Sequence, residues 1–151
     1  MAAMLSPTVG VDIVEIGRVR RVLERHDGRF LARVYTPVEV AFCRGRLAEL
    51  AARFAAKEAV MKALGTGARG IAWREIEVLP DGRGKPLVYL YGRAQGRAQE
   101  LGLTALDVSL SHSQEYAVAF AVGSRQALPA QELWTCRERL VARLKERGLL
   151  K

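Results

Sequence analysis

The sequence predicts an α+β domain. Its 151 residues are about the length of one domain, and 50% of them are apolar while 26% are charged, which is typical of a globular protein. Segments with the two-residue period of strands and segments with the 3.6-residue period of helices follow one another without strict strand–helix–strand alternation. That irregular order favours an α+β architecture over a doubly wound parallel sheet.

The first two elements are expected to be a strand and a helix. Residues 9–16 predict the strand, because Val9, Val11 and Ile13 alternate onto one face before a glycine interrupts the pattern. Residues 18–30 predict the helix, with apolar side chains along one side. Its other side carries a basic ridge at spacings of three and four residues, formed by Arg18, Arg21, Arg25 and Arg29.

Two further helices are expected before residue 65. Thr36 is a suitable cap for the first of them, with Pro37 at the first helical position and Glu39 in the first turn. Residues 47–64 show the longest helical pattern of the chain, rich in Ala and Leu, and Gly65 ends it.

The following part of the chain changes to the period of strands. Turn residues at 81–86 separate two of the strands, and residues 94–101 predict a short helix that a glycine ends. A hairpin is expected around residues 112–115. The four strands are expected at residues 73–79, 87–91, 107–111 and 116–122.

Residues 125–151 are expected to form a basic helical extension beyond a domain that spans residues 1–124. Pro129 is suited to open the helix, and Trp134, Leu140 and Leu144 lie on or near one side of it. The extension holds 7 basic and 3 acidic residues, so it carries a charge of +4, which is half of the net charge of +8. Packing against the domain, covering a sheet edge and lying loose are all compatible with this pattern.

Charge and cysteine content restrict the possible functions. The excess of 24 basic over 16 acidic residues indicates an acidic protein partner, a phosphate-rich ligand or nucleic acid. Two distant cysteines cannot form a disulfide scaffold, and no apolar run is long enough to cross a membrane, so a cytoplasmic protein is expected. Nucleotide-binding glycine motifs, a nucleophile elbow and zinc-ligand spacing are absent from the sequence.

Three charged residues stand out against their surroundings. Asp12 lies in an apolar strand between Val11 and Ile13, where an ionised carboxylate is unfavourable unless it is paired or bound to a metal. Glu58 lies at the edge of the apolar stripe of the long helix, and Lys62 follows one turn later. A solvent-facing or paired Asp12 and a surface Glu58–Lys62 pair would be purely structural. Two converging carboxylates would instead suit Mg²⁺, with Lys62 against a phosphate oxygen.

Two further positions suit contact with a polar ligand. His112 ends an expected strand between Ser111 and Ser113, which are small hydroxyl residues. Lys85 and Pro86 belong to the turn that joins the strands at 73–79 and 87–91. A lone histidine is more often structural than functional, and most such turns are only turns, so these residues by themselves leave both interpretations open.

Four segments, in this order along the chain, resemble the holo-[acyl-carrier-protein] synthases, the short class of 4'-phosphopantetheinyl transferases. VGVDIVEIGRV resembles the opening segment of that family, and RFAAKEAVMKALGTG is similar to its signature helix almost letter for letter. GKP and SLSHSQEYAVAFAV are similar to its later segments, so that the resemblance spreads over residues 9–122. It implies the fold of that family: a small antiparallel sheet packed with helices, one of them long and central.

The resemblance also implies an enzyme activity. Such an enzyme transfers the 4'-phosphopantetheine arm of coenzyme A to a serine of apo acyl carrier protein, releases adenosine 3',5'-bisphosphate and supports fatty acid biosynthesis. The resemblance places Asp12 and Glu58 at the Mg²⁺ ligands and Lys62 at the catalytic lysine that contacts the pyrophosphate. For the general base, Glu15, Glu39, a water at the metal and bulk solvent all stay open.

Contacts with partners are implied by the same resemblance. Arg18, Arg21 and Arg25 lie on the helix that family members present to the acidic carrier protein, and Arg18 matches best. The family resemblance further implies a homotrimer with active sites between subunits. The expected coenzyme A contacts are Arg53, Lys62, Gly65, Lys85, Pro86, His112 and Ser113.

Two alternatives are weighed against this function. The first is the same transfer to carrier domains of polyketide or peptide synthases. The second is a basic nucleic-acid-binding domain, which the net charge and the arginine ridge permit. Aromatic residues make up only 7% of the chain, and Asp12 and Glu58 would repel phosphates without a metal. We therefore expect neither a nucleic acid nor a membrane among the partners.

Overall fold

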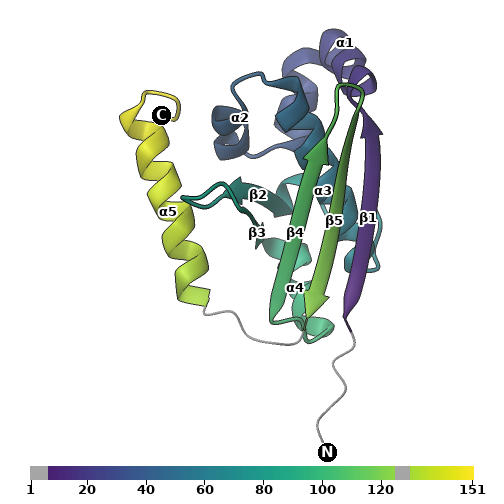
Figure 1. Cartoon of the computed structure of the whole chain (residues 1–151). Coiled ribbons are helices and arrows are strands. Elements are labelled where there is room, and N and C mark those ends of the chain that lie inside the picture. Colours follow the sequence, from purple (N-terminus) through teal and green to yellow (C-terminus); the bar gives the residue numbers. More distant parts are fainter. Residues whose placement is uncertain (1–6, 125–129) are drawn as a thin grey trace, which may run out of the picture.

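The structure is a computed structural model that describes residues 7–124 and 130–151, and it shows an antiparallel sheet covered by helices (Figure 1). Five strands lie in the order β1-β5-β4-β3-β2. They are β1 (Thr8–Glu15), β2 (Ile76–Pro80), β3 (Pro86–Leu90), β4 (Ala105–His112) and β5 (Tyr116–Ser124). The helices are α1 (Ile16–Val34), α2 (Pro37–Cys43), α3 (Leu47–Ala63), α4 (Gly92–Glu100) and α5 (Ala130–Glu146), with a 3₁₀ turn at η1 (Trp73–Glu75). The expected α+β class is confirmed.

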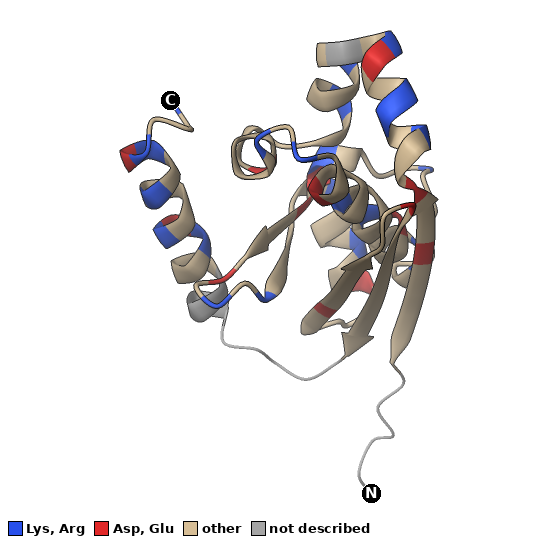
Figure 2. Cartoon of the chain, turned by 45° about the horizontal axis from the view of Figure 1, so that its top comes forward, with Lys and Arg blue, Asp and Glu red and all other residues tan. Residues whose placement is uncertain are grey.

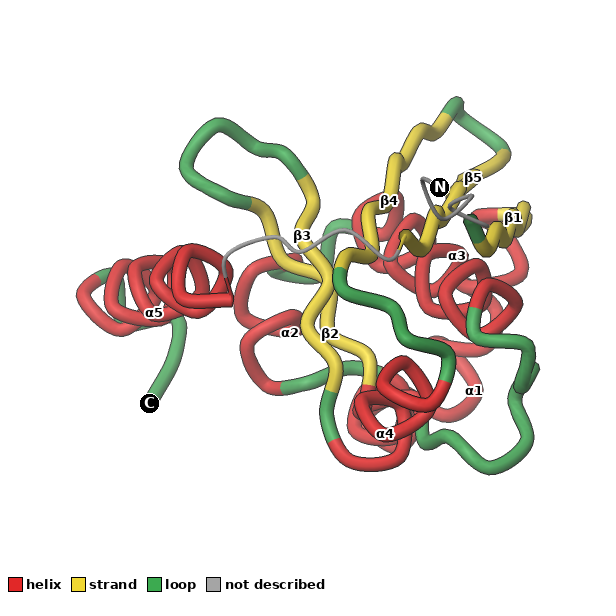
Figure 3. Tube along the Cα trace, turned by 90° about the horizontal axis from the view of Figure 1, so that it is seen from below, coloured by secondary structure: helices red, strands yellow, loops and turns green. Residues whose placement is uncertain are grey.

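The sheet consists of two parts. Strands β1, β5 and β4 pair along their whole length, whereas β3 meets β4 through the single pair Leu87 and Asp107. The β2–β3 hairpin therefore diverges from the other three strands and extends toward α5 (Figure 3). The hairpin expected around residues 112–115 is confirmed, since β4 and β5 flank it.

Helix α3 is the central element, as expected. It lies against β1 and β5 with most of its small side chains buried, among them Ala51, Ala55, Ala56 and Ala59. The approach to β1 is so close that a Cβ atom on Gly10 would clash with the carbonyl oxygen of Ala59. Only glycine fits at this position, and the contact holds the strand that carries Asp12 directly against α3.

Two predicted elements differ clearly from the structure, and the environment of a third could not be predicted. The strand predicted from Trp73 begins at Ile76, because Trp73 stacks on Phe54 and the side chain of Glu75 accepts from the Ala72 amide to close a 3₁₀ turn. Helix α1 is longer than the predicted range of 18–30, since Gly28 does not interrupt it. The alternating face of β1 is exposed to solvent, with Ile13 64% exposed, although it is apolar.

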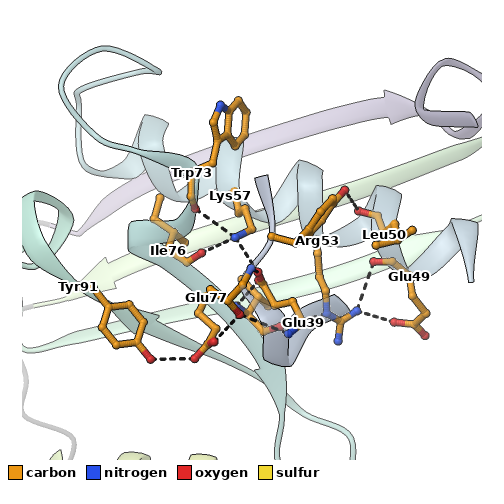
Figure 4. A network of polar contacts seen from close by, with 12 residues as sticks. Glu39, Glu49, Leu50, Arg53, Lys57, Trp73, Ile76, Glu77 and Tyr91 are labelled. Carbon is orange, nitrogen blue, oxygen red and sulfur yellow. Dashed lines mark hydrogen bonds and ion pairs between the residues drawn. The ribbon is translucent and has the colours of Figure 1, made fainter. Parts of the chain in front are cut away.

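A buried polar network joins α2, α3 and β2 (Figure 4). The capping box predicted at Thr36 is confirmed, because Glu39 accepts from the Thr36 amide and donates its own amide to the Thr36 hydroxyl. The same carboxylate accepts from the ammonium of Lys57 at 2.8 Å and from the Val78 amide at 2.8 Å. Both Glu39 and Lys57 are fully buried. Glu77, equally buried, accepts from Thr36 in this network.

The C-terminal helix packs against the domain. Leu144 of α5 is buried among Val38, Leu79 and Tyr89, so the extension neither lies loose nor stands apart. Two predictions concern residues 125–129, which lie outside the described residues. They are the start of this helix at Pro129 and the boundary between residues 124 and 125. In the described part of the chain, every helix is too short or too polar to cross a membrane.

Candidate active site

Asp12, Glu58 and Lys62 line one cleft of about 380 Å³ between β1, α1 and α3. Asp12 lies on the face of β1 that turns toward α3, since its neighbours Val11 and Ile13 point to solvent. Glu58 and Lys62 lie one turn apart on α3 and therefore share a face of the helix. The structure thus brings together the three residues that the sequence singled out, from elements about fifty positions apart.

Both signs of charge meet at this cleft, through Asp12 and Glu58 on one hand and Lys62 and Arg18 on the other. The Lys62 ammonium lies 3.1 Å from a carboxylate oxygen of Asp12 and donates to the carbonyl oxygen of Val11 at 2.8 Å. The pKa of Glu58 is raised above its ordinary value, first by partial burial and then by the negative charge of Asp12, while Lys62 opposes the shift. Burial and the carboxylate of Asp12 therefore both disfavour the ionised form of Glu58.

This donor set suits a hard divalent cation. Mg²⁺ binds through one or two carboxylates and fills its other positions with waters and substrate phosphates. Asp12 and Glu58 offer two carboxylates at a solvent-accessible cleft, and the repulsion that raises the pKa of Glu58 would be relieved by such a cation. Within residues 7–124 and 130–151, no cluster of three or more His, Cys, Asp or Glu side chains is placed to hold a metal.

The arginines expected to bind a carrier protein are exposed on α1. Arg18 lines the cleft of Asp12 and Glu58, whereas Arg21 and Arg25 lie further along the helix in solvent. Figure 2 shows basic residues along the exposed part of α1, which follows directly on β1. A positively charged surface therefore borders the cleft on the side of α1.

The expected coenzyme A contacts do not gather in that cleft. Arg53, Pro86 and His112 line a second cleft, of about 470 Å³, between α3, the β2–β3 turn and α5. Lys62 stays with Asp12 in the first cleft, about 14 Å along α3 from Arg53 at 1.5 Å per residue. In a single chain, the expected contacts are thus divided between two clefts that both border α3.

Three expected contact residues line neither cleft. Gly65 follows α3 in the left-handed conformation, with φ of 71°. Lys85 is half-exposed and forms an ion pair with Asp107 at 3.2 Å. Ser113 lies in the β4–β5 turn, where its hydroxyl accepts from the amides of Glu115 and Tyr116. Their expected roles toward coenzyme A stay predictions.

Two features of the sites were not recognised in the sequence. Glu39 is fully buried, and its carboxylate is fully occupied by Lys57 and two backbone amides, so it is not available as a general base. Arg143 of α5 and Arg147, in the turn directly after α5, line the second cleft. Their four-residue spacing on an amphipathic helix was a visible signal, but the cleft they face is formed by distant parts of the chain.

Comparisons with known proteins show which family the chain resembles. A sequence model described as the 4'-phosphopantetheinyl transferase superfamily matches residues 8–121. The holo-[acyl-carrier-protein] synthase of Herpetosiphon aurantiacus is 52% identical over 121 residues, which cover 76% of this chain and 95% of that protein. The enzyme of the same name from Moorella thermoacetica is 53% identical over 116 residues, covering 75% of this chain and 90% of the relative.

Solved structures show the same fold. The holo-[acyl-carrier-protein] synthase of Helicobacter pylori, in complex with coenzyme A, superposes with a TM-score of 0.71 at 30% identity, covering 77% of this chain and 99% of that one. The enzyme of Bacillus anthracis, in complex with CoA (3',5'-ADP), superposes with a TM-score of 0.67 at 35% identity, covering 82% and 100%. The match of the superfamily over most of the chain, together with relatives above 50% identity, shows that the chain belongs to the 4'-phosphopantetheinyl transferase superfamily.

Proposed function

We propose that this chain transfers the 4'-phosphopantetheine arm of coenzyme A to a serine of an apo acyl carrier protein and releases adenosine 3',5'-bisphosphate. The observation that carries the proposal is the meeting of Asp12, Glu58 and Lys62 in one cleft, from a strand and a helix that are distant in the sequence. Relatives named holo-[acyl-carrier-protein] synthase and their complexes with coenzyme A support the choice of donor and acceptor.

The chemistry follows from the charges of the cleft. Transfer forms a bond between the serine oxygen and the phosphorus of the arm, and it breaks the bond from that phosphorus to the bridging oxygen of the diphosphate. Asp12 and Glu58 would hold Mg²⁺, which supplies charge neutralisation at the diphosphate. Lys62, which is 50% exposed, reaches the cleft as a mobile cation and stabilises the departing phosphate. Because Glu39 is buried and occupied, the serine proton passes to Glu15 or to water.

The arginine ridge of α1 is proposed to bind the carrier protein. Arg18, Arg21 and Arg25 are exposed, and Arg18 borders the cleft in which the serine must arrive. Acyl carrier proteins are acidic, so complementary charge would steer the encounter and fix the register of the two proteins. Such a contact should weaken at high salt, because the Debye length falls from about 10 Å at 0.1 M to about 3 Å at 1 M.

Arg18→Glu is expected to raise the KM for carrier protein about tenfold and to change the KM for coenzyme A much less. Initial rates measured with each substrate varied in turn give both constants. The matched control is Arg33→Glu, which reverses the same charge in the last turn of α1. Equal effects on the two constants would count against docking through Arg18.

The chain is further proposed to form a homotrimer with active sites between subunits. The outer face of β1 and β5 is apolar and exposed in the single chain, through Val9, Val11, Ile13, Tyr116, Val118 and Phe120. Contiguous apolar surface of this kind is typical of a protein interface. His112 ends β4 opposite the buried Ala117 and does not line the cleft of Asp12, so contact between His112 and that cleft would require a neighbouring subunit.

Phe120→Glu is expected to convert the oligomer to a smaller species, because it places a charge in the centre of the apolar face. Size-exclusion chromatography with light scattering measures the mass. Gln99→Glu, on the exposed surface of α4, introduces the same charge elsewhere and serves as control. A monomeric parent protein, or an unchanged mass in the variant, would contradict the proposed interface.

Mass spectrometry tests the proposed activity directly. An apo acyl carrier protein is incubated with the chain, coenzyme A and Mg²⁺, and the mass of one phosphopantetheine arm is expected to appear on its serine. A panel that also holds carrier domains of polyketide and peptide synthases distinguishes the proposed role in fatty acid biosynthesis from its alternative. We further infer a cytoplasmic location, which the two free cysteines support.

A further inference from the structure

The C-terminal helix α5 lies beyond the part of the chain that the relatives share. The superfamily match ends at residue 121, and the two relatives above 50% identity cover 76% and 75% of this chain. Helix α5 nevertheless packs closely on the β2–β3 hairpin and α2, beside which it lies in Figures 1 and 3. It is therefore an addition to the shared domain that has a defined place on its surface.

Polar and aromatic contacts fix the position of α5. The ring of Trp134 lies against Tyr89 and Tyr91, with centroids 5.6 and 5.8 Å away. The guanidinium of Arg137 donates at 2.7 Å to Glu77, a carboxylate that is only 1% exposed. Since a buried carboxylate strongly favours a charged partner, this pair anchors the helix and sets its rotation about its axis.

In this position, α5 forms one wall of the second cleft. The cleft of about 470 Å³ has the size of a small-molecule site. Helix α5 contributes Leu140 and Arg143 to it, and the turn directly after α5 contributes Arg147. The shared domain contributes Arg53 and His112. Other parts of the lining are apolar or turn residues, namely Phe42, Ala52, Pro80, Gly84, Pro86, Leu110 and Leu144.

The cleft carries uncompensated positive charge. Among the described residues, no carboxylate lies within ion-pair distance of Arg44, Arg143 or Arg147, and all three are exposed. Of the two acidic residues in the lining, Glu49 is paired with Arg53, and Asp81 accepts from backbone amides of its own turn. The surplus favours an anionic ligand, and the guanidinium geometry suits a phosphate group.

We infer that Arg143 of α5 and Arg147, in the turn directly after α5, bind the 3'-phosphate of coenzyme A, with the adenosine against the apolar lining of the second cleft. This inference rests on the proposed function, which leaves the diphosphate at Asp12, Glu58 and Lys62. Both clefts border α3 but on different sides, since residues five positions apart, such as Arg53 and Glu58, lie about 140° apart around a helix. One coenzyme A would therefore reach both kinds of cleft between neighbouring subunits of the proposed trimer. A structural relative binds CoA (3',5'-ADP), which carries the same 3'-phosphate. The extension would thus add two ligand contacts that the shared domain lacks.

Binding measurements on the full chain test the inference without catalysis. Isothermal titration calorimetry compares adenosine 3',5'-bisphosphate with adenosine 5'-monophosphate, which lacks the 3'-phosphate. Arg143→Gln and Arg147→Gln are each expected to weaken bisphosphate binding about tenfold, as for the loss of one charged hydrogen bond, and to leave monophosphate binding within about twofold. Lys145→Gln is the matched control, since it removes the same charge from α5 at a position that does not line the cleft.

The inference is overturned if both arginine variants bind the bisphosphate like the parent, or if they lose both nucleotides equally. Transfer assays with coenzyme A and 3'-dephospho-coenzyme A show whether the inference about the arginines or the proposed transfer activity is wrong. If both variants transfer the arm at the parental rate with an unchanged KM for coenzyme A, only the proposed role of these arginines is contradicted. A higher KM for carrier protein alone would also overturn it, by assigning the arginines to the protein partner. If the parent protein transfers no arm, but the arginine variants bind adenosine 3',5'-bisphosphate more weakly than the parent does, only the proposed function is contradicted.

Discussion

Glu58→Gln is expected to lower the rate of arm transfer at saturating Mg²⁺ about 100-fold or more while the protein stays folded. The substitution keeps the size of the side chain but removes one of the two carboxylates at the cleft, and with it half of the negative charge available to a divalent cation. Rates are measured by mass spectrometry of the carrier protein. Glu138→Gln, an exposed carboxylate on α5, is the matched control and should keep the parental rate.

The same variant should not be less stable than the parent when metal is absent. The pKa of Glu58 is raised in the folded protein, so its ionised form disfavours folding at pH values above that raised pKa. The disadvantage disappears as the pH falls below the ordinary pKa of a glutamate, because the side chain is then neutral both folded and unfolded. In EDTA at pH 7, Glu58→Gln is therefore expected to melt at or above the Tm of the parent, and the two Tm values should converge near pH 3.

The effect of Mg²⁺ on Tm tests the role of Glu58 without any measurement of turnover. Binding to the folded state raises Tm by mass action, so the parent should melt higher in Mg²⁺ than in EDTA, and Glu58→Gln should lose most of this difference. Near-normal transfer by the variant, or an identical Mg²⁺ effect on both proteins, would contradict the assignment of Glu58 as a metal ligand.

Lys57→Met is expected to lower the free energy of unfolding by about 3–5 kcal/mol, because it leaves a buried charge without its partner. The Lys57 ammonium is fully buried and donates to Glu39 and to the carbonyl oxygens of Trp73 and Ile76 (Figure 4). Burial lowers the pKa of Lys57, and the carboxylate of Glu39 opposes that shift by favouring the charged form. Urea denaturation followed by circular dichroism measures the loss.

The contrast with Lys62→Met makes this prediction specific. Lys62 lies on the same helix and also pairs with a carboxylate, but its side chain is 50% exposed, so its loss should change stability by at most about 1 kcal/mol. Lys62→Met should instead lose transfer activity. The double variant Glu39→Gln/Lys57→Met should recover part of the stability, since it also removes the buried carboxylate that Lys57→Met alone leaves without its partner. Equal stability of the two single lysine variants would refute a structural role for Lys57.

Much of the fold could be predicted from the sequence because its signals are local. The capping box at Thr36, the end of α3 before Gly65 and the β4–β5 hairpin depend on residues a few positions apart, and each was found where expected. The strand predicted from Trp73 was wrong by one turn, because stacking on Phe54 and the bond from the Ala72 amide to Glu75 outweigh the strand propensity of the segment.

The candidate site was predictable only in part. Asp12 and Glu58 drew attention because each carboxylate stands in an apolar pattern, and the structure places both at one cleft. Their convergence depends on Gly10, whose missing side chain lets β1 approach α3, and nothing in the spacing of the two acids specifies that approach. The division of Arg53 and His112 into a second cleft likewise follows from the path of the β2–β3 hairpin and from α5.

By itself, the sequence determined which residues share a face of each helix or strand, the family resemblance and the types of chemistry available. Tertiary structure decided which of those faces is buried. Lys57 lies on the apolar stripe of α3 and Lys62 lies one turn after Glu58, but only packing places Lys57 opposite Glu39 and Lys62 at an open cleft beside Asp12. The apolar face of β1 likewise points to solvent. Periodicity orients side chains about one element only, whereas burial depends on the elements that pack against it.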